Sequence, residues 1–156
     1  MLHTSMVYIL IRTFPECILV LFSGCILLNL NIPKSKVFKT GIIYALIVSF
    51  IRILPIHFGI HTLLSIILTT FILLYFSNKN LIDLLATTCG IFIALLFSEV
   101  IYLNTFTNIF KLHYNLIVDN FSLSSALLSL PSLLIFLILV KLINIIQRKF
   151  NKFMSM

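Results

Sequence analysis

The sequence has few charged residues, and acidic residues are the scarcest of them. Asp and Glu together number 4 in 156 residues, and charged residues make up 10% of the chain, against about 25% in a soluble domain. Hydrophobic residues make up 61%, and the mean hydropathy is +1.20. A chain of this length cannot enclose so much apolar surface, because small globules leave much of their surface in water. The composition excludes a soluble globular domain and predicts an integral membrane protein.

The sequence also has no tryptophan and only three cysteines. Cys17, Cys25 and Cys89 lie in apolar segments, without a CxxC pair or a spacing typical of metal ligands. This placement gives no evidence of a disulfide framework. We interpret the three thiols as small buried hydrophobic groups.

Catalytic motifs are missing as well. We find no HExxH motif, no DxxxD-like pair of carboxylates and no Ser–Lys dyad, which are signatures of membrane peptidases and related enzymes. We therefore expect no enzymatic activity and no cofactor. The net charge of +7 does not predict nucleic-acid binding, because the lysines lie in short loops between apolar runs. The lipid bilayer is the partner that this pattern favours.

Five apolar runs are long enough to cross a bilayer, whose hydrocarbon core of about 30 Å needs roughly 20 residues. Pro33, Pro55 and the polar cluster 77–80 separate the first four runs. Residues 106–122 are too polar to span, and they predict a short helix at the interface before the last span. We therefore predict a single all-α transmembrane domain over 1–156. Its spans are expected at about 14–30, 38–54, 57–76, 82–105 and 123–146.

The basic residues set the expected orientation. With five spans, all but three of the 11 Lys and Arg residues fall on one side of the membrane. Lys and Arg in short loops mark the cytoplasmic side, so we expect the N-terminus outside and the C-terminus in the cytoplasm. The residues expected inside are Lys34, Lys36, Lys39, Lys79, Lys141, Arg148, Lys149 and Lys152, and those expected outside are Arg12, Arg52 and Lys111.

This topology gathers the ionisable residues of the spans near the outer leaflet. Arg12 and Glu16 are four residues apart at the start of span one, so they share a helix face if Pro15 does not break the turn between them. An ionisable group inside a membrane is costly and usually faces the bundle interior. Two arginines and two glutamates balance in charge, so we expect cross-helix ion pairs, for instance Arg12 or Arg52 with Glu99. The candidate binding residues are Arg12, Glu16, Arg52, His57, His61 and Glu99.

Three interpretations of this polar cluster remain open. The ion pairs could be purely structural and fix how the helices meet. The cluster could instead line a pocket that opens outward and binds a ligand or titrates, since histidine changes charge between pH 5 and 8. A metal site of His57, His61 and Glu99 is the weakest interpretation, because a lone HxxxH on a helix is not specific and no cysteine supports it; we expect no metal.

Glycine and proline give two further expectations. Gly24, Gly41 and Gly90 are small enough to permit close contacts between helices. Pro131 falls inside the last predicted span and should kink that helix.

Three stretches carry a resemblance to a known family. Residues 11–22 (IRTFPECILVLF), residues 51–64 (IRILPIHFGIHTLL) and the pair Ser98-Glu99 resemble the membrane-spanning N-terminal sensor segment of Gram-positive bacterial histidine kinases. The resemblance extends over nearly the whole chain. In such kinases this segment precedes cytoplasmic phosphotransfer and ATPase regions. This chain has neither a phosphoacceptor helix nor an ATP-binding motif, so the resemblance implies the sensor part without kinase activity, in a bacterial plasma membrane.

Together these observations favour a multi-pass membrane sensor-like or regulatory module. We expect it to bind a signal, or a membrane or cytoplasmic signalling protein, through the outer polar cluster. The alternative is a small membrane transport subunit that binds a substrate near the outer face. Solute uptake by cells that carry the gene would favour transport, and a changed transcription response without uptake would favour sensing.

Overall fold

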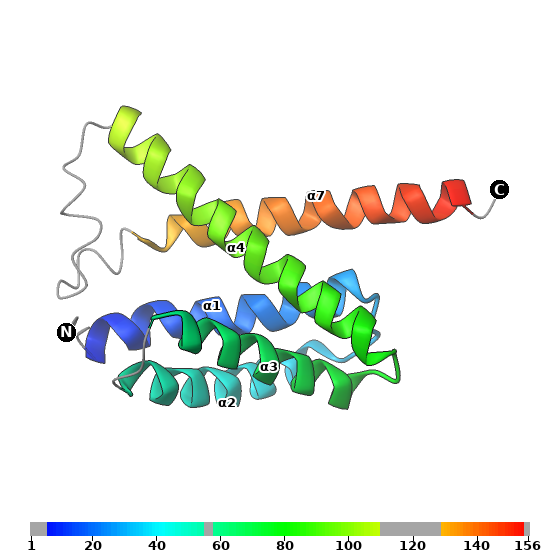
Figure 1. Ribbon diagram of the computed structural model, residues 1–156, viewed down its shortest axis with the longest axis horizontal. Helices are drawn as coiled ribbons and strands as arrows, with labels where there is room; N and C mark the ends of the chain where they lie inside the picture. Colours follow the sequence, from blue (N-terminus) through cyan, green and yellow to red (C-terminus); the bar gives the residue numbers. More distant parts are fainter. Residues whose placement is uncertain (1–5, 55–57, 110–128, 155–156) are drawn as a thin grey trace.

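The computed structural model describes residues 6–54, 58–109 and 129–154, and this part of the chain is helical, with no strand. The prediction of an all-α protein is confirmed, and the described chain has five helices, which Figure 1 labels in order. They are α1 (Met6–Leu27), α2 (Lys34–Ile53), α3 (Phe58–Phe76), α4 (Leu81–Ile109) and α7 (Pro131–Met154).

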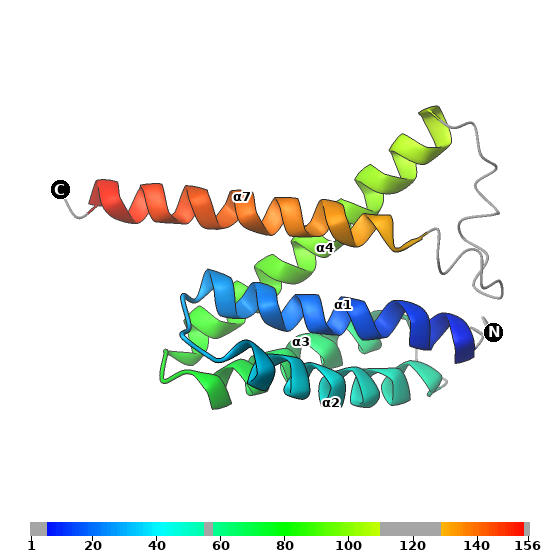
Figure 2. The same cartoon turned by 180° about the vertical axis from the view of Figure 1, so that it is seen from behind.

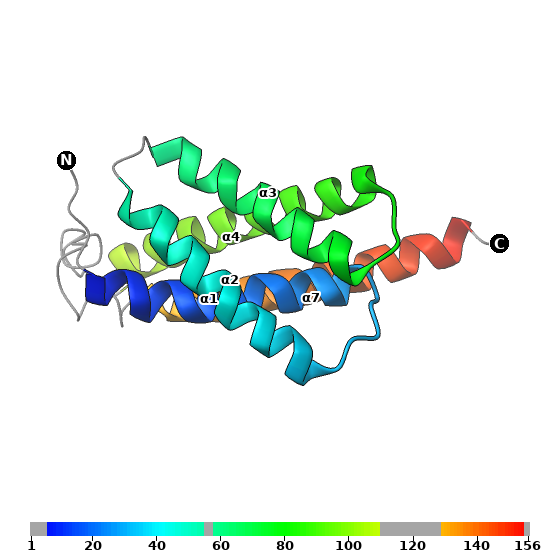
Figure 3. The same ribbon diagram turned by 90° about the horizontal axis from the view of Figure 1, so that it is seen from below.

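The helices alternate in direction along the long axis of the molecule. The connections at 28–33 and 77–80 are short, so the helices that they join are antiparallel neighbours. In Figures 1 and 2, α1, α2 and α3 lie side by side, α7 lies along the opposite side of α1, and α4 crosses obliquely over one face of α1 and α7. In the view of Figure 3, α3 and α4 lie on one side of α1, and α2 crosses α1. Helix α1 contacts each of the other four helices and is therefore the centre of the bundle.

One hydrophobic core lies between α1, α2 and α3. Cys17, Leu21, Cys25 and Leu28 follow one another at intervals of four or three residues, which places them on one face of α1. This face packs against α2, α3 and the first turn of α4. Its buried partners on those helices are Val37, Tyr44, Ala45, Val48, Leu73 and Leu84. Cys17 and Cys25 are thus buried in this core as free thiols.

A second core lies on another face of α1, between α4 and α7. Val20 is the buried contribution of α1. Ile91 of α4 and Phe136 of α7 are both fully buried there. The oblique α4 therefore contributes to both cores, through Leu84 near its start and Ile91 two turns later.

Two of the three glycines permit close helix contacts. A Cβ on Gly41 of α2 would lie 3.0 Å from Ile18 Cγ1 and 3.4 Å from Ile18 Cα of α1. A Cβ on Gly24 of α1 would lie 2.8 Å from Leu73 Cδ1 of α3. A Cβ on Gly90 would meet nothing within 4 Å, so the prediction is correct for Gly24 and Gly41 and wrong for Gly90.

Three helices, and not the predicted five, are long and apolar enough to cross a membrane. The stretches are Gly59–Phe76, Leu81–Asn108 and Pro131–Lys149. Helix α2 differs because it has three lysines in its first two turns and Arg52 in its last turn. Helix α1 carries Arg12, Pro15 and Glu16. Large apolar side chains on the three candidate spans are exposed at the protein surface, which agrees with a membrane protein.

Pro131 does not kink the last helix, because it is the first residue of α7. At that position the missing N–H of proline has no helical partner to lose. The predicted interfacial helix at 106–122 is not confirmed: 106–109 belong to α4, and the rest lies outside the described residues. In α1 the helix continues through Pro15, so Arg12 and Glu16 remain on one face.

Candidate functional site

Four ionisable side chains meet at the end of the bundle where α1 begins and α2 ends. Arg12 and Glu16 lie in the first half of α1, and Arg52 lies in the last turn of α2. Glu99 lies in the second half of α4. The alternating directions of the helices bring these positions to the same end. We call Arg12, Glu16, Arg52 and Glu99 the charge network.

Glu16 and Arg52 form the more buried half of the charge network. Arg52 Nη2 donates to Glu16 Oε1 at 2.7 Å, and Arg52 Nη1 donates to Glu16 Oε2 at 3.3 Å. Thr13 Oγ1 accepts a further bond from Arg52 Nη1 at 3.0 Å. This is a two-pronged arginine–carboxylate pair, the geometry that adds most to strength and specificity. It joins α1 to α2.

Arg12 lies between two carboxylates and extends the charge network to α4. Its Nη2 donates to Glu99 Oε1, and its Nε lies 3.9 Å from Glu16 Oε2. The order of charges is therefore Arg52, Glu16, Arg12, Glu99, with opposite signs next to each other and no net charge. Of the two pairs expected for Glu99, the structure has the one with Arg12.

The four side chains differ in how far they can be reached from the surface. The side chain of Glu16 is 8% exposed and that of Arg12 is 21% exposed. Those of Arg52 and Glu99 are 31% and 32% exposed. Glu16 is thus the enclosed centre of the charge network, and Glu99 is the carboxylate that an external group can approach.

Thr13 is a member of the site that the sequence analysis did not identify. It is fully buried, and its hydroxyl is a partner of Arg52. It stands three residues before Glu16, so the two side chains share a helix face. That spacing is the signal in the sequence, but threonine is common in apolar helices, so the spacing alone does not indicate a site.

Of the two candidate histidines, the structure describes only His61. His61 lies in the first turns of α3 and is half-buried, and its backbone carbonyl accepts a bond from Ser65 Oγ at 2.8 Å. His57 lies outside the described residues. Within 6–54, 58–109 and 129–154, no three His, Cys, Asp or Glu side chains are grouped as they would be around a metal ion. The role assigned to the two histidines stays a prediction.

Away from the charge network, buried hydroxyl groups form hydrogen bonds with one another between neighbouring helices. Tyr44 Oη of α2 and Thr69 Oγ1 of α3 are 2.7 Å apart, and Thr70 Oγ1 and Thr88 Oγ1 join α3 to α4 at 2.9 Å. Thr69 also donates to the Ser65 carbonyl at 2.6 Å. These groups are buried, so each bond avoids the cost of an unpaired polar group away from water. We assign them to packing.

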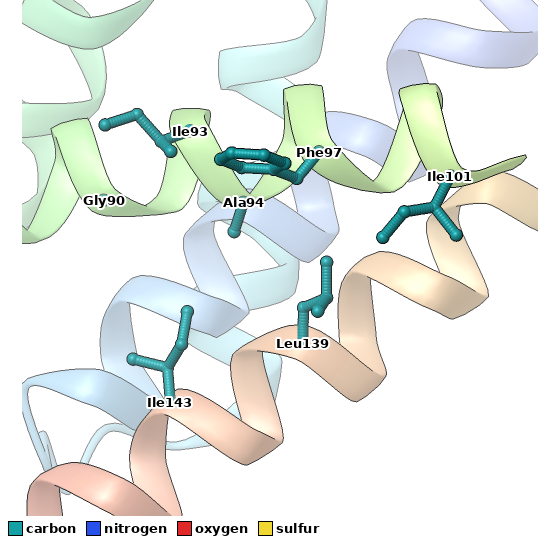
Figure 4. Close-up of a pocket in the computed structure, with 7 residues that line it drawn as sticks. All are labelled: Gly90, Ile93, Ala94, Phe97, Ile101, Leu139 and Ile143. Carbon is teal, nitrogen blue, oxygen red and sulfur yellow. The ribbon is translucent and has the colours of Figure 1, made fainter. Parts of the chain in front are cut away.

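A separate apolar groove of about 230 Å³ lies between α4 and α7. Figure 4 shows Ala94 pointing from α4 toward α7, while Leu139 and Ile143 point from α7 toward α4. No member of the charge network lines this groove, and none of its lining residues is charged, so it does not fit a charged ligand. The lining residues are Gly90, Ile93, Ala94, Phe97, Ile101, Leu139 and Ile143.

Comparison with known proteins gives no assignment. No family model matches the chain, and no curated protein or solved structure matches it. The resemblance to the sensor segment of histidine kinases therefore stays a prediction.

Proposed function

We propose that the protein is a multi-pass membrane module that responds to a signal, and that the charge network is its binding site. The observation that carries the proposal is the contrast between the two arginine–carboxylate pairs. Glu16 and Arg52 form a two-pronged pair around an enclosed carboxylate. Arg12 and Glu99 form a pair whose carboxylate is about a third exposed. The second pair is the one at which an external charged group can compete.

Competition at this pair would act on α4. Arg12 is on α1, and Glu99 is on the part of α4 that extends away from α2 and α3 in Figure 1. A ligand cation that takes the place of Arg12 at Glu99 would remove the ion pair that ties this part of α4 to α1. A signal can shift the position of a helix only by binding one arrangement better than another. Exchange of ion-pair partners supplies such a difference.

The same proposal includes five membrane crossings, with the N-terminus outside and the C-terminus in the cytoplasm of a bacterial cell. Helices α1 and α2 pack along α3 with alternating directions. Their internal charges are paired with one another, which lowers the cost of placing them in a membrane. Lys34, Lys36 and Lys39 lie at the other end of α2, where they would meet the cytoplasmic surface.

Cysteine labelling tests this topology. In a chain whose native cysteines are replaced by serine, we expect Asn108→Cys at the end of α4 to react with an impermeant maleimide in intact cells. We expect Lys149→Cys near the end of α7 to react only after the cells are permeabilised. Both positions are exposed, so access should depend on the side of the membrane. The reverse pattern would overturn the orientation.

Substitution of Glu99 tests the function. We expect Glu99→Gln to change the transcription response of cells that carry the chain, because Arg12 loses a partner on α4. Arg12→Gln should have the same effect, and the double variant Arg12→Gln with Glu99→Gln should add little to it, because both changes break the same pair. The readout is the transcript profile of matched cultures.

Asp83→Asn is the matched control, because it also replaces a carboxylate of α4 with an amide, at an exposed position outside the charge network. It should leave the response unchanged. Equal effects of Glu99→Gln and Asp83→Asn would contradict a role for the ion pair. Solute uptake that depends on Glu99, with no change in transcription, would instead assign the protein to the alternative class of small transport subunits.

A further inference from the structure

The end of the bundle opposite the charge network is organised around the C-terminus of α1. Leu30 N donates to the Cys25 carbonyl at 2.9 Å, and Asn29 N donates to the Ile26 carbonyl at 3.2 Å. Asn29 has a φ of 51°, the left-handed conformation that closes a helix in this way. The Leu28 carbonyl and the Asn29 side chain remain available as acceptors for other helices.

Two cations from distant parts of the chain use these adjacent acceptors. Lys79 Nζ, from the loop between α3 and α4, donates to the Leu28 carbonyl at 2.8 Å. Arg148 Nη2, from the last turns of α7, donates to Asn29 Oδ1 at 3.2 Å. Because their acceptors are consecutive residues, Lys79 and Arg148 are neighbours in space. Both also lie at the negative end of the α1 helix dipole.

A third cation lies beside the α3–α4 loop. Lys36 Nζ of α2 is 5.6 Å from the centre of the Tyr75 ring and 5.5 Å from that of Phe76. These aromatic residues end α3, three to four residues before Lys79. We call Lys36, Lys79 and Arg148 the basic triad.

The basic triad has more positive charge than its protein partners balance. Every ion pair found among the described residues belongs to the charge network at the other end of the bundle. The groups that hold Lys79 and Arg148 are a carbonyl and an amide, which are neutral. An ammonium has three donors and a guanidinium has five, and the structure uses one on each side chain here. Donors and charge therefore remain for an external anion.

The positions of the candidate spans bring the basic triad to the membrane surface. The loop 77–80 joins one candidate span that ends at Phe76 to the next, which begins at Leu81, and the span of α7 ends at Lys149. Lys79 and Arg148 thus stand at the ends of candidate spans, where the lipid headgroups of one bilayer face are expected. Tyr75 and Ile82 on either side of the loop are exposed apolar residues, which suits contact with acyl chains.

We propose that the basic triad binds the phosphate of an anionic phospholipid. Lys79 and Arg148 supply charge-assisted hydrogen bonds to the phosphate oxygens. Lys36 contributes positive charge beside them, and the acyl chains lie against the exposed apolar residues of α3 and α4. At the level of the headgroups, the phosphates of anionic phospholipids are the anions that the bilayer itself supplies. The site is independent of the charge network and of the function proposed for it.

Native mass spectrometry of the full chain in a non-ionic detergent tests the site. The probe is an equimolar mixture of phosphatidylglycerol and phosphatidylcholine with the same acyl chains. We expect the wild type to retain phosphatidylglycerol preferentially. In the double variant Lys79→Gln with Arg148→Gln, the ratio of bound phosphatidylglycerol to bound phosphatidylcholine should fall about tenfold. Each cation near the surface contributes to the binding of anionic lipid.

Lys34→Gln with Lys149→Gln is the matched control, because it removes two exposed cations from the same end of the bundle. It should keep most of the preference, and an equal loss would overturn the proposal in favour of diffuse attraction. Lys79→Arg with Arg148→Lys keeps both charges and should keep the preference, which separates loss of the anion site from damage to the end of α1. Binding of inorganic phosphate as tight as that of phosphatidylglycerol would also overturn the assignment to a lipid.

Discussion

Glu16→Gln is expected to lower the free energy of unfolding by about 3 kcal/mol, because it breaks a buried ion pair and leaves a charge without its partner. Glu16 accepts two bonds from Arg52, and its carboxylate also lies beside Arg12. In the amide a donor NH2 replaces one of the two acceptor oxygens and the negative charge is lost, so the two-pronged pair with Arg52 cannot form. Unfolding by sodium dodecyl sulfate in mixed micelles, followed by circular dichroism, measures the change.

Two further variants decide whether the loss comes from the unpaired charge. Asp83→Asn makes the same chemical change at an exposed site and should alter stability by less than about 0.5 kcal/mol. Glu16→Gln with Arg52→Gln should be more stable than the sum of the single changes, because the stranded cation is removed as well. Strict additivity would contradict the pair as a stabilising unit.

Gly41→Leu should have the second large effect, a loss of about 3 kcal/mol, because α1 and α2 have no space for a side chain at this point. The Cβ of any residue here already lies 3.0 Å from Ile18 Cγ1 and 3.4 Å from the Ile18 backbone. A leucine therefore has to push α2 away from α1, which loosens the core and separates Arg52 from Glu16. The same micellar unfolding experiment reports the loss.

Gly90→Leu is the matched control for Gly41→Leu. The substitution is identical and also lies within a helix, but a Cβ on Gly90 meets nothing within 4 Å. It should be close to neutral or slightly stabilising, because leucine has the higher helix propensity. Gly41→Ala should fall between the two, since the flexible end of Ile18 can move by a few tenths of an ångström. A tolerated Gly41→Leu would show that the α1–α2 contact is not tight.

The end of α2, which Pro55 sets, was predicted from the sequence, whereas α2 begins at Lys34, four residues before the predicted span. Pro33 stands immediately before α2, and Leu54, the residue before Pro55, has the extended conformation that proline imposes on its predecessor, with φ −65° and ψ 137°. The ends of α3 also agree with the prediction to within one residue. Steric rules of this kind are local, so they do not depend on which helices pack together.

Other boundaries were predicted less well, because polar residues can be satisfied inside a helix. The predicted fourth span stopped at 105, but α4 continues to Ile109. Asn108 Nδ2 donates to Asn104 Oδ1 at 2.6 Å, and the hydroxyls of Thr105 and Thr107 bond to carbonyls one turn earlier. These residues mark a polar segment in the sequence, but within the helix they pair with one another and with its backbone.

The charged members of the site could be identified from their cost in an apolar helix, but their pairing could not. Arg12 and Arg52 are both near the same end of the bundle, and either could in principle reach Glu99. Which one does so depends on how α1, α2 and α4 are rotated and how far apart they lie. In the structure α2 contacts α1 and α3, whereas α4 contacts α1 directly, so Glu99 meets Arg12.

Helix α4 is much longer than the hydrocarbon core of a bilayer is thick. Its candidate span of 28 residues extends about 42 Å at 1.5 Å per residue, whereas the core measures about 30 Å. The 18-residue stretch of α3 extends about 27 Å and fits without inclination. The mismatch between span length and bilayer thickness is therefore largest for α4. Its oblique course in Figure 1 shortens the length that it projects across the bilayer. Bilayer thickness thus bears directly on the inclination of the helix that carries Glu99.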